Sequence, residues 1–494
     1  MKRGEITVFF SLLLFGLLLF LGTLLESARD AIARERTTLT TAAALQSVWA
    51  AYDQQLHNRY HLLAYDLSLG QSFSKERLQQ HWLEEANRTV RTTTGDLSPV
   101  TAVRAELEQA DLLTDYQGAE FRDQAVSYMK RVVGIADIEK WLNRLPEQAE
   151  AEKQQEELER LKEELPALWE KLDAANTGDE AIPATAKPDG RKTDGRTEEQ
   201  PLSWLEKLRL QQAGFDLAKY LPAGFELHQG RLNDDDLFTE RKTTAWEGFH
   251  SPADIGWLEE GVLAEYYLRH FSFATEPTAD TAGKASAAGR LTYQVEYLLY
   301  GQNTDIQNLR SAAEAIHRLR TAINFIYLQT DMKRQKSAEL PATVLATLLG
   351  EPKAKDVIKQ ALLFYWSTRE ADWEIKSLFA GGAIALLKGD ASWKTALYGP
   401  LPEPEAGGGT EAGLRFSYRD YLRLLLLWHR SETTGRALNL IEYELRQYDG
   451  YAGVQLDRYM VSGRISYRWR AAPLFPFALP LQPGEWQISR KYSY

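Results

Sequence analysis

The chain has 494 residues, enough for more than one hydrophobic core, because a single core stops growing at roughly 250 to 300 residues. Its 58 basic and 69 acidic residues give a net charge of −11, which argues against binding a nucleic acid backbone, since that requires a clustered positive surface. The absence of cysteine excludes disulfides, thiolate nucleophiles and cysteine-ligated metal sites.

Residues Ile6–Leu25 read ITVFFSLLLFGLLLFLGTLL and contain no charged side chain. At about 1.5 Å per residue, a helix of this length spans the roughly 30 Å hydrocarbon core of a bilayer. We therefore predict a transmembrane anchor over 1–27, in which Thr7, Ser11 and Thr23 return their hydroxyls to the helix backbone. A cleaved signal peptide is the alternative, but its apolar region normally has about 7 to 15 residues and ends in small residues.

The charges that flank this run do not fix its orientation. Lys2 and Arg3 favour a cytoplasmic N-terminus, whereas Arg29, Arg34 and Arg36 lie just beyond the other end. On charge alone the two topologies are nearly equivalent. Long domains are exported largely regardless of charge, so these arginines do not prevent an extracytoplasmic C-terminal domain.

The residues that follow the span predict a helix that continues the anchor as an amphipathic stem. Their apolar positions recur mostly at steps of three and four and are Ala28, Ile32, Leu39, Ala42, Ala43, Trp49, Tyr52, Leu56, Tyr60 and Leu63. We expect a helical stem and membrane-proximal domain over 28–172, with further helices near 75–91 and 123–142. Alternating charges at helical spacing predict a solvated helix over 147–172.

The remaining chain divides into a linker and a second domain. Residues 173–201 are rich in Gly, Pro, Thr and charge, which predicts a disordered linker. We expect a C-terminal, mainly helical α+β domain over 202–494, with helices at 202–220, 255–269, 309–328, 354–379 and 418–428. Alternating apolar residues predict strands at 290–299 and 459–469, and with 485–492 these are expected to form a small antiparallel sheet. The predicted fold class is mainly α with a minor antiparallel β-sheet.

Motifs for catalysis or metal binding are weak. His57 and His61 would share one helix face, but Asn58 stands where zinc hydrolases of this design carry Glu, and no third ligand is evident. The Ser72–Lys75 stretch (SFSK) lacks the companion motifs of penicillin-binding enzymes. Glycine-rich phosphate loops and a nucleophile elbow are missing from the sequence. We therefore predict no catalytic, cofactor-binding or metal-ligating residue, and no cofactor.

Two patterns keep an enzymatic alternative open. Acidic pairs could act as general acid and base, although 69 acids make such pairs unavoidable; they include Glu259 with Glu260 and Glu442 with Glu444. Tryptophans at helical spacing could line a sugar-binding surface, although aromatic residues so spaced more often form core; they are Trp366, Trp373 and Trp393. A membrane-tethered cell-envelope enzyme acting on wall polymers requires a cleft where both converge.

Two parts of the chain resemble a domain-of-unknown-function family of Gram-positive single-span membrane proteins. The first is GEITVFFSLLLF, with LLESARDAIA and LQSVWAAYDQQLHNRYHLLAYD after it; the second is YQVEYLLYGQNTDIQNLRSAAEAIHRLRTAINFIYLQTD, with FYWSTREADWEIKSLFAGGAIALLK. The resemblance covers both halves and skips the linker. It implies association with Tad pilus loci and a likeness to the TadE and TadG pseudopilins, in which one long helix starts in the membrane and then packs against a globular head. It assigns no catalytic residue.

The sequence departs from type IV prepilins at one position. Prepilins are cleaved after a Gly and carry Glu at the fifth position of the mature helix. With Gly4 as the cleavage position, the fifth residue is Phe9, and Glu5 stands at the first. Cleavage by a prepilin peptidase is therefore a hypothesis.

These observations lead us to expect a non-enzymatic, membrane-anchored structural or assembly component of a Tad-like pilus or surface secretion apparatus. The expected partners are the lipid bilayer, through the N-terminal helix, and other pilus or secretion-system proteins, with no nucleic acid. The resemblance favours an extracytoplasmic C-terminal domain. An extracellular sensor is a third hypothesis, but the few residues before the span leave no room for a cytoplasmic output domain.

Overall fold

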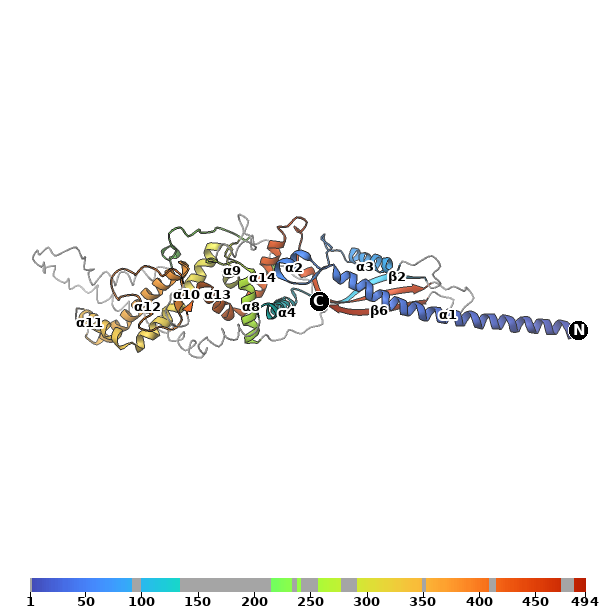
Figure 1. The fold of residues 1–494 in the computed structure, drawn as a ribbon, viewed down its shortest axis with the longest axis horizontal. Coiled ribbons are helices and arrows are strands. Elements are labelled where there is room, and N and C mark those ends of the chain that lie inside the picture. The colour runs from blue at the N-terminus through green and yellow to red at the C-terminus, as the bar shows by residue number, and fades with distance from the viewer. Residues whose placement is uncertain are drawn as a thin grey trace, which may run out of the picture. The chain divides into compact units, whose positions relative to one another are not determined.

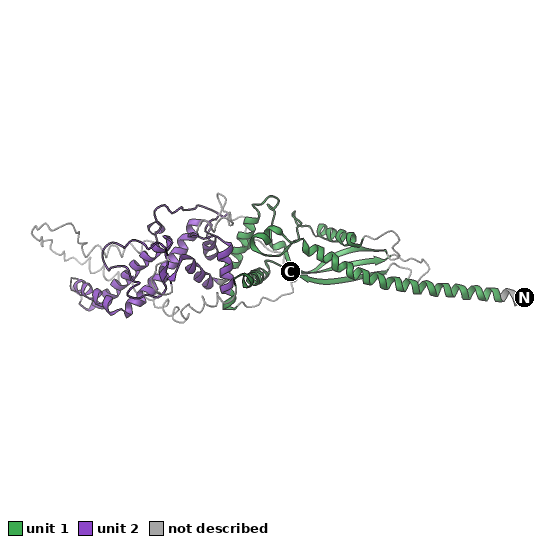
Figure 2. Cartoon of the chain, in the orientation of Figure 1, with its two compact units in different colours: residues 1–133, 233–259, 431–494 green, residues 134–232, 260–430 purple. Residues whose placement is uncertain are grey.

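The computed structural model describes residues 2–90, 99–133, 215–232, 238–240, 256–276, 291–348, 352–407, 415–471 and 484–494. The predicted polar helix over 147–172 and the predicted linker over 173–201 lie outside the described residues. The chain groups into two compact units, coloured separately in Figure 2. Unit 1 comprises Met1–Val133, Asn233–Glu259 and Ser431–Tyr494; unit 2 comprises Gly134–Leu232 and Glu260–Arg430. The sequence-based division placed 202–494 in one domain, whereas the last of these residues group with the N-terminal ones.

Unit 1 combines helices with a four-stranded antiparallel sheet (Figure 1). Its helices are α1 (Lys2–Ala50), α2 (Gln54–Tyr60), α3 (Lys75–Val90), α4 (Asp115–Val132) and α14 (Arg430–Leu445), of which the first residue belongs to unit 2. Its strands are β1 (Tyr65–Asp66), β2 (Val100–Leu112), β5 (Tyr459–Ala471) and β6 (Gly484–Ser493). Two short 3-10 helices cover Phe238–Glu240 and Leu456–Arg458.

Strand β5 is the centre of this sheet. It pairs with β2 from Val100↔Ala471 to Leu112↔Met460 and with β6 from Ala471↔Gly484 to Ser462↔Ser493. Strand β1 adds two pairs at the start of β5. The register of β2 shifts at three places along the strand, and such bulges increase the twist of a long pair of strands. The last strands of the chain, β5 and β6, therefore lie in the same unit as the N-terminal helix.

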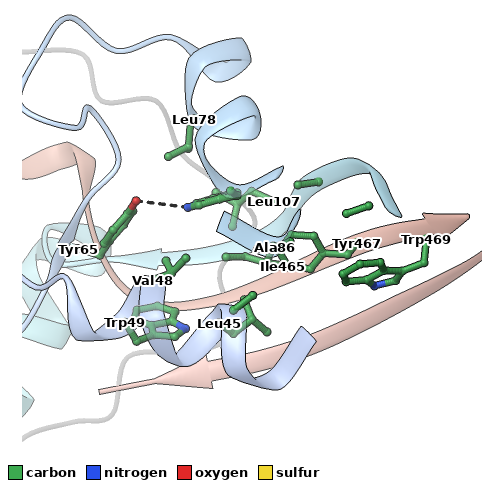
Figure 3. Packing of buried hydrophobic residues seen from close by; sticks show 14 of the residues in the cluster. Leu45, Val48, Trp49, Tyr65, Leu78, Ala86, Leu107, Ile465, Tyr467 and Trp469 are labelled. Carbon is green, nitrogen blue, oxygen red and sulfur yellow. Dashed lines mark hydrogen bonds between the residues drawn. The ribbon is translucent and has the colours of Figure 1, made fainter. Parts of the chain in front are cut away.

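The core of unit 1 lies between this sheet and helices α1 and α3. Figure 3 shows Leu45 and Val48 of α1 and Leu78 of α3 directed toward Ile465 and Tyr467 of β5. These side chains belong to one buried cluster, in which Trp82 of α3 also donates its indole N–H to the hydroxyl of Tyr65 over 3.3 Å. Each large side chain buried here contributes about 1.5 to 3 kcal/mol through removal of apolar surface from water.

Unit 2 is built mainly from helices. They are α8 (Trp257–His270, whose first three residues group with unit 1), α9 (Gln294–Tyr300), α10 (Asp305–Thr330), α11 (Met332–Leu348), α12 (Lys355–Phe379) and α13 (Tyr418–Trp428). Strands β3 (Ile384–Ala385) and β4 (Arg415–Phe416) form a two-stranded antiparallel sheet, and 3-10 helices cover Leu217–Lys219 and Pro352–Ala354. Helix α10 packs against α9, α11 and α12, so it forms the centre of the unit.

Local sequence explains where several of these helices begin and end. Asp53 caps α2 by accepting the amide of Leu56 over 2.9 Å. Ser417 and Asp420 form a reciprocal capping box at the start of α13. Gly301 ends α9 in the left-handed conformation, with φ of 62°.

The structure confirms the predicted fold class, because the chain is mostly helical with small antiparallel sheets and one long apolar N-terminal helix. Helices α3, α8, α10, α12 and α13 match predicted helices, and β5 and β6 match predicted strands. Helix α4 was also predicted, but it begins at Asp115, earlier than expected.

One predicted strand is wrong. Residues 290–299 alternate between aromatic or apolar and polar side chains, but Gln294–Tyr300 form helix α9. Every residue from Gln294 to Leu299 is buried, so the alternation does not distinguish a core face from a solvent face. Because this helix is buried on all sides, the alternation of residue types in its sequence does not report which face is exposed, and it cannot identify a strand.

Other boundaries also differ from the prediction. The stem helix ends at Ala50, and α2 is a separate helix that starts at Gln54. Strand β2 and helices α11 and α14 were not predicted. Of the predicted helix over 202–220, residues 202–214 lie outside the described part, and only Leu217–Lys219 form a 3-10 turn.

Candidate functional site: the anchor helix and its attachment

The first half of α1 has the surface of a membrane span. All of its large apolar side chains from Ile6 to Leu25 are exposed to the surroundings. Ser11 donates its hydroxyl to the carbonyl of Thr7 over 2.8 Å, and Thr23 donates to that of Phe20 over 2.8 Å. The prediction is confirmed for the hydroxyls of Ser11 and Thr23, which therefore need no partner in lipid. In the described residues α1 is the one helix long and apolar enough to cross a membrane.

The burial of α1 side chains changes immediately after Leu25. Glu26 and Arg29 are both buried and form an ion pair of 3.1 Å one helical turn apart. Ala33, Thr37 and Thr41 follow on the same side of α1, and all three are buried. The large apolar side chains are therefore exposed up to Leu25, and on this side of α1 the side chains are buried in the protein within one turn after it.

Two tryptophans attach α1 to the sheet. Trp469 of β5 and Trp486 of β6 are partners in neighbouring strands. The indole N–H of Trp469 donates to Thr41 Oγ1 over 3.0 Å, and that of Trp486 donates to Thr37 Oγ1 over 3.0 Å. Because Thr37 and Thr41 lie one turn apart, the two bonds fix both the rotation and the height of the helix on the sheet.

A second group of aromatic residues holds the upper end of α1. The ring of Trp49 stacks on Tyr492 with centroids 6.2 Å apart and meets Tyr494 edge-on at 4.8 Å. The hydroxyl of Tyr494 donates to the carbonyl of Trp49 over 2.7 Å. Burial raises the pKa of Tyr494 well above its usual range, so this donor remains protonated. Tyr492 and Tyr494, near the end of the chain, thus pack on the last turn of α1.

The predicted stem face needs a correction. Among the apolar positions that predicted an amphipathic stem, Ile32 and Leu39 are 63% and 64% exposed, whereas Trp49 is buried. The helix instead packs through its other side, which includes Ala33, Ala44 and Leu45. Threonines are among the buried residues because tryptophan N–H groups satisfy their hydroxyls, which a search for apolar periodicity alone does not detect.

In unit 2, a fully buried ion cluster occupies the space between α10 and α12. Arg320 of α10 donates to both carboxylate oxygens of Glu374, over 2.8 and 2.5 Å. Lys388 bridges Glu374 and Glu370, each over 2.6 Å. Burial alone would raise the pKa of Glu374, but Arg320 and Lys388 outweigh it and lower this pKa to about 2. Two acids and two bases cancel in charge, as expected for a structural network.

The tryptophans considered for a sugar-binding surface are part of the core. Trp366, Trp373 and Trp393 are all buried. Trp366 and Trp393 both donate their indole N–H to the carbonyl of Thr395, over 3.1 and 2.9 Å, and Trp373 donates to that of Glu403 over 3.0 Å. Since each ring edge is bound to backbone, these side chains present no aromatic platform to a ligand.

The acidic pairs have structural partners as well. Glu259 accepts from Lys130 over 2.7 Å, and this bond lowers the pKa of Glu259. Glu442 accepts the amide of Leu456 over 2.8 Å, and Glu444 forms a buried ion pair with Arg59. The carboxylates are thus used to join segments of unit 1.

The histidine pair does not form a metal centre in the described residues, which contain no group of three or more potential ligands. His57 lies in α2, whereas His61 caps its C-terminus in a left-handed conformation with φ of 55°. Their rings meet edge-on at 6.0 Å, and His61 stacks on Tyr128 at 4.2 Å. The predicted single helix face is broken at His61.

A polar group that the sequence did not reveal joins three segments of unit 2. Asp372 Oδ1 lies 2.9 Å from Nε2 of His317 and accepts the hydroxyl of Tyr220 over 2.8 Å. Phe215 stacks on Tyr220 at 4.8 Å and shields the group. Burial and the adjacent Asp372 raise the pKa of Tyr220, so the phenol serves as a donor. The carboxylate therefore orients both rings, and the group connects the segment of Phe215 and Tyr220 to α10 and α12.

Comparison with family models matches residues 191–471 to a family described as of unknown function (DUF5702). The match lies over the second part of the chain and leaves the anchor helix outside it. No curated protein and no solved structure matches the chain.

Proposed function

The chain belongs to the family of unknown function DUF5702, and we propose that it is a membrane-anchored structural or assembly component of a surface apparatus. The observation that carries this proposal is α1, a single helix with an exposed apolar first half and a second half fixed to a sheet. An attachment of this kind holds the folded unit at a fixed height and orientation relative to the apolar half of α1. That is the property that a structural component requires.

The finer assignment is to a Tad-like pilus or secretion apparatus. It is supported by the likeness of unit 1 to the pilin plan, in which one long N-terminal helix starts in the bilayer and then packs against a globular head. In this chain, α1 meets both β5 and β6. Other pilus or secretion-system proteins are the partners that this assignment implies.

An enzymatic role has less support. The acidic pairs hold neighbouring segments together, and the tryptophans fill the core of unit 2, so neither group is directed at a substrate. The buried acids of unit 2 are neutralised by Arg320 and Lys388. A cell-envelope enzyme would require a cleft in which such groups converge.

Topology is the first test of the proposal, and the absence of native cysteine makes it a clean one. Single cysteines are introduced as Ser337→Cys, at an exposed position of α11, and as Thr185→Cys, and intact cells are treated with a membrane-impermeant maleimide. Labelling of both would agree with an extracytoplasmic domain. A control, Lys2→Cys, should be labelled only after lysis. The reverse pattern would overturn the proposal.

Participation in a surface structure is tested separately. Deletion of the gene should abolish the fibres that shearing releases from the cell surface, and expression of the wild-type chain should restore them. Unchanged fibres in the deletion strain would contradict the Tad-like assignment. Mass spectrometry of the N-terminus addresses processing after Gly4, and recovery of an intact Met1 or Lys2 peptide from the mature protein would exclude cleavage there.

A further inference from the structure

Beyond the predicted bilayer, α1 has two sides with different chemistry. The side that includes Ala33, Thr37 and Ala44 is buried against the sheet. The opposite side is exposed, yet it carries Ile32 and Leu39, which are among the most exposed large apolar residues of the described chain. Two exposed apolar side chains are ordinary by themselves, and they indicate a packing surface only where they belong to a longer apolar line.

These exposed residues continue a regular seam that begins inside the span. Steps of alternately four and three residues connect the apolar positions of the seam, which are Leu14, Leu18, Leu21, Leu25, Ala28, Ile32 and Leu39, with Glu35 at the step between the last two. This spacing places side chains along one line of a helix and is the pattern through which two helices pack. All of these residues are exposed.

Lipid does not reach the outer part of this seam. At about 1.5 Å per residue, Ile32 lies about 10 Å and Leu39 about 21 Å beyond Leu25. The headgroup layer on each side of the hydrocarbon core is roughly 5 to 8 Å thick. The chain's own sheet covers the opposite side of α1, and no described residue buries Ile32 or Leu39, so a further protein surface is needed to cover them.

We propose that this seam is the contact between the α1 helices of two copies of the chain. Copies inserted in one membrane point the same way, so their helices are parallel, and a two-fold axis brings each seam residue beside its own counterpart. Leucine, alanine and isoleucine pair with themselves without a charge or a polar group to satisfy. The contact therefore extends from the middle of the bilayer into the stem.

The one charged position of the seam is compatible with this pairing. Glu35 is exposed and is followed by Arg36, which is half-buried and donates to the carbonyl of Val90 in its own chain over 3.4 Å. In a parallel pair, Glu35 and the seam residues seven and fourteen positions before it face both their counterpart and the residue that follows that counterpart. Each Glu35 therefore meets an Arg36 of the second copy, which offsets the repulsion between the two carboxylates.

Cysteine crosslinking in native membranes tests the proposal, and the chain has no cysteine of its own. Single variants Ala28→Cys, Ile32→Cys and Leu39→Cys place a thiol in the seam. Packed helices lie 8 to 10 Å apart, which brings facing Cα atoms within the roughly 4.4 to 6.8 Å of a disulfide. Oxidation should convert these variants to a species of twice the mass.

Each seam variant has a matched control at its neighbouring position. Ser27→Cys, Ala31→Cys and Thr38→Cys lie at almost the same depth but are turned by about 100° around the helix. We expect crosslinking of seam variants to exceed that of their controls at least tenfold. A double change in the seam, Ile32→Glu with Leu39→Glu, should abolish the crosslink reported by Ala28→Cys while the chain stays in the membrane fraction.

Two outcomes would overturn the proposal. Equal crosslinking of seam and control positions would indicate random collision, and absence of any dimer at all three seam positions would exclude a second copy as the occupant. The inference rests on the membrane insertion in the proposed function, which the maleimide labelling tests independently. A monomer with an extracytoplasmic head would contradict this inference alone and leave the proposed function standing.

Discussion

Trp469 and Trp486 lie opposite each other on neighbouring strands and bind two threonines of the same helix through their indole N–H groups. Neither tryptophan is near α1 in the sequence. The pair nevertheless determines how the membrane helix sits on the sheet, because each bond has one acceptor, and the acceptors are separated by a single turn. A stem with this attachment cannot rotate relative to its head without breaking both bonds.

Loss of the bond between Trp469 and Thr41 should destabilise unit 1. Trp469→Phe keeps an aromatic ring but leaves the buried hydroxyl of Thr41 without its donor, which costs about 1 to 3 kcal/mol. Denaturant unfolding of the full chain in detergent, followed by circular dichroism, measures the change. In a Thr41→Val background the same change should cost about 1 kcal/mol less; an equal cost in both backgrounds would show that the bond contributes nothing.

Gly118 should be sensitive to any side chain. It adopts a left-handed conformation with φ of 80°, and an added Cβ would lie 2.7 Å from Thr434 Cγ2 and 3.0 Å from Leu438 Cδ1. Gly118→Ala therefore combines backbone strain of about 1 to 2 kcal/mol with overpacking of about 1 to 3 kcal/mol.

A matched control separates these two effects. Gly70 has a similar φ of 72°, but nothing lies within 4 Å of its added Cβ. Gly70→Ala should therefore show the backbone strain alone in the same denaturant experiment. Equal losses of stability in the two variants would contradict the close contact of Gly118 with α14.

Removal of Arg320 should be among the most damaging single changes in unit 2. Arg320→Ala leaves Glu374 with Lys388 as its remaining cationic partner in a fully buried site, and breaking such a pair costs about 3 to 5 kcal/mol. Arg318→Ala, two residues away on the same helix, removes an exposed ion pair of 3.7 Å with Glu314 and should cost less than about 1 kcal/mol. Similar melting temperatures for both variants would argue against the buried network.

Glu296 should make the stability of unit 2 depend on pH. Burial raises the pKa of Glu296 from 4.5 to about 7, although the amide of Ala274 and the hydroxyl of Tyr418 both donate to its Oε1. Its Oε2 has no hydrogen-bond partner among the described residues. An acid whose pKa is raised by folding contributes stability that is fully present below pH 4.5 and is lost as the pH rises through 7.

The matching variant is Glu296→Gln, which cannot ionise. Relative to this variant, the wild-type chain should lose about 3 kcal/mol of unfolding free energy between pH 4.5 and pH 8. Parallel denaturation curves of the two proteins at both pH values measure the difference. A constant difference across this range would contradict the shifted pKa of Glu296.

Features that depend on neighbouring residues could be predicted from the sequence. An uncharged run of twenty residues determines its own preference for a bilayer, and the three- and four-residue spacing in 418–428 reproduces the bounds of α13. The predicted strand at 485–492 likewise matches β6, of which only one face packs against α1. In each case the burial of one face leaves a period in the sequence.

The candidate site could be predicted only in part. The apolar helix long enough to span a membrane was recognised, but the attachment of α1 to the sheet was not. That attachment depends on the pairing of Val100 with Ala471 and of Ala471 with Gly484. Beyond Leu25, α1 has one surface that faces the sheet and one that is exposed. Apolar spacing alone does not show that Ile32 and Leu39 lie on the exposed one.

The sequence by itself therefore determined the long apolar N-terminal helix, the mainly helical composition and most helix positions, because these follow from local hydrophobicity and spacing. Only the tertiary structure decided that the last strands return to the first helix, that α9 is a helix and which side of α1 is covered. The physical reason is that contacts between distant segments are selected by packing and hydrogen bonding in three dimensions, and these leave no regular period in the chain.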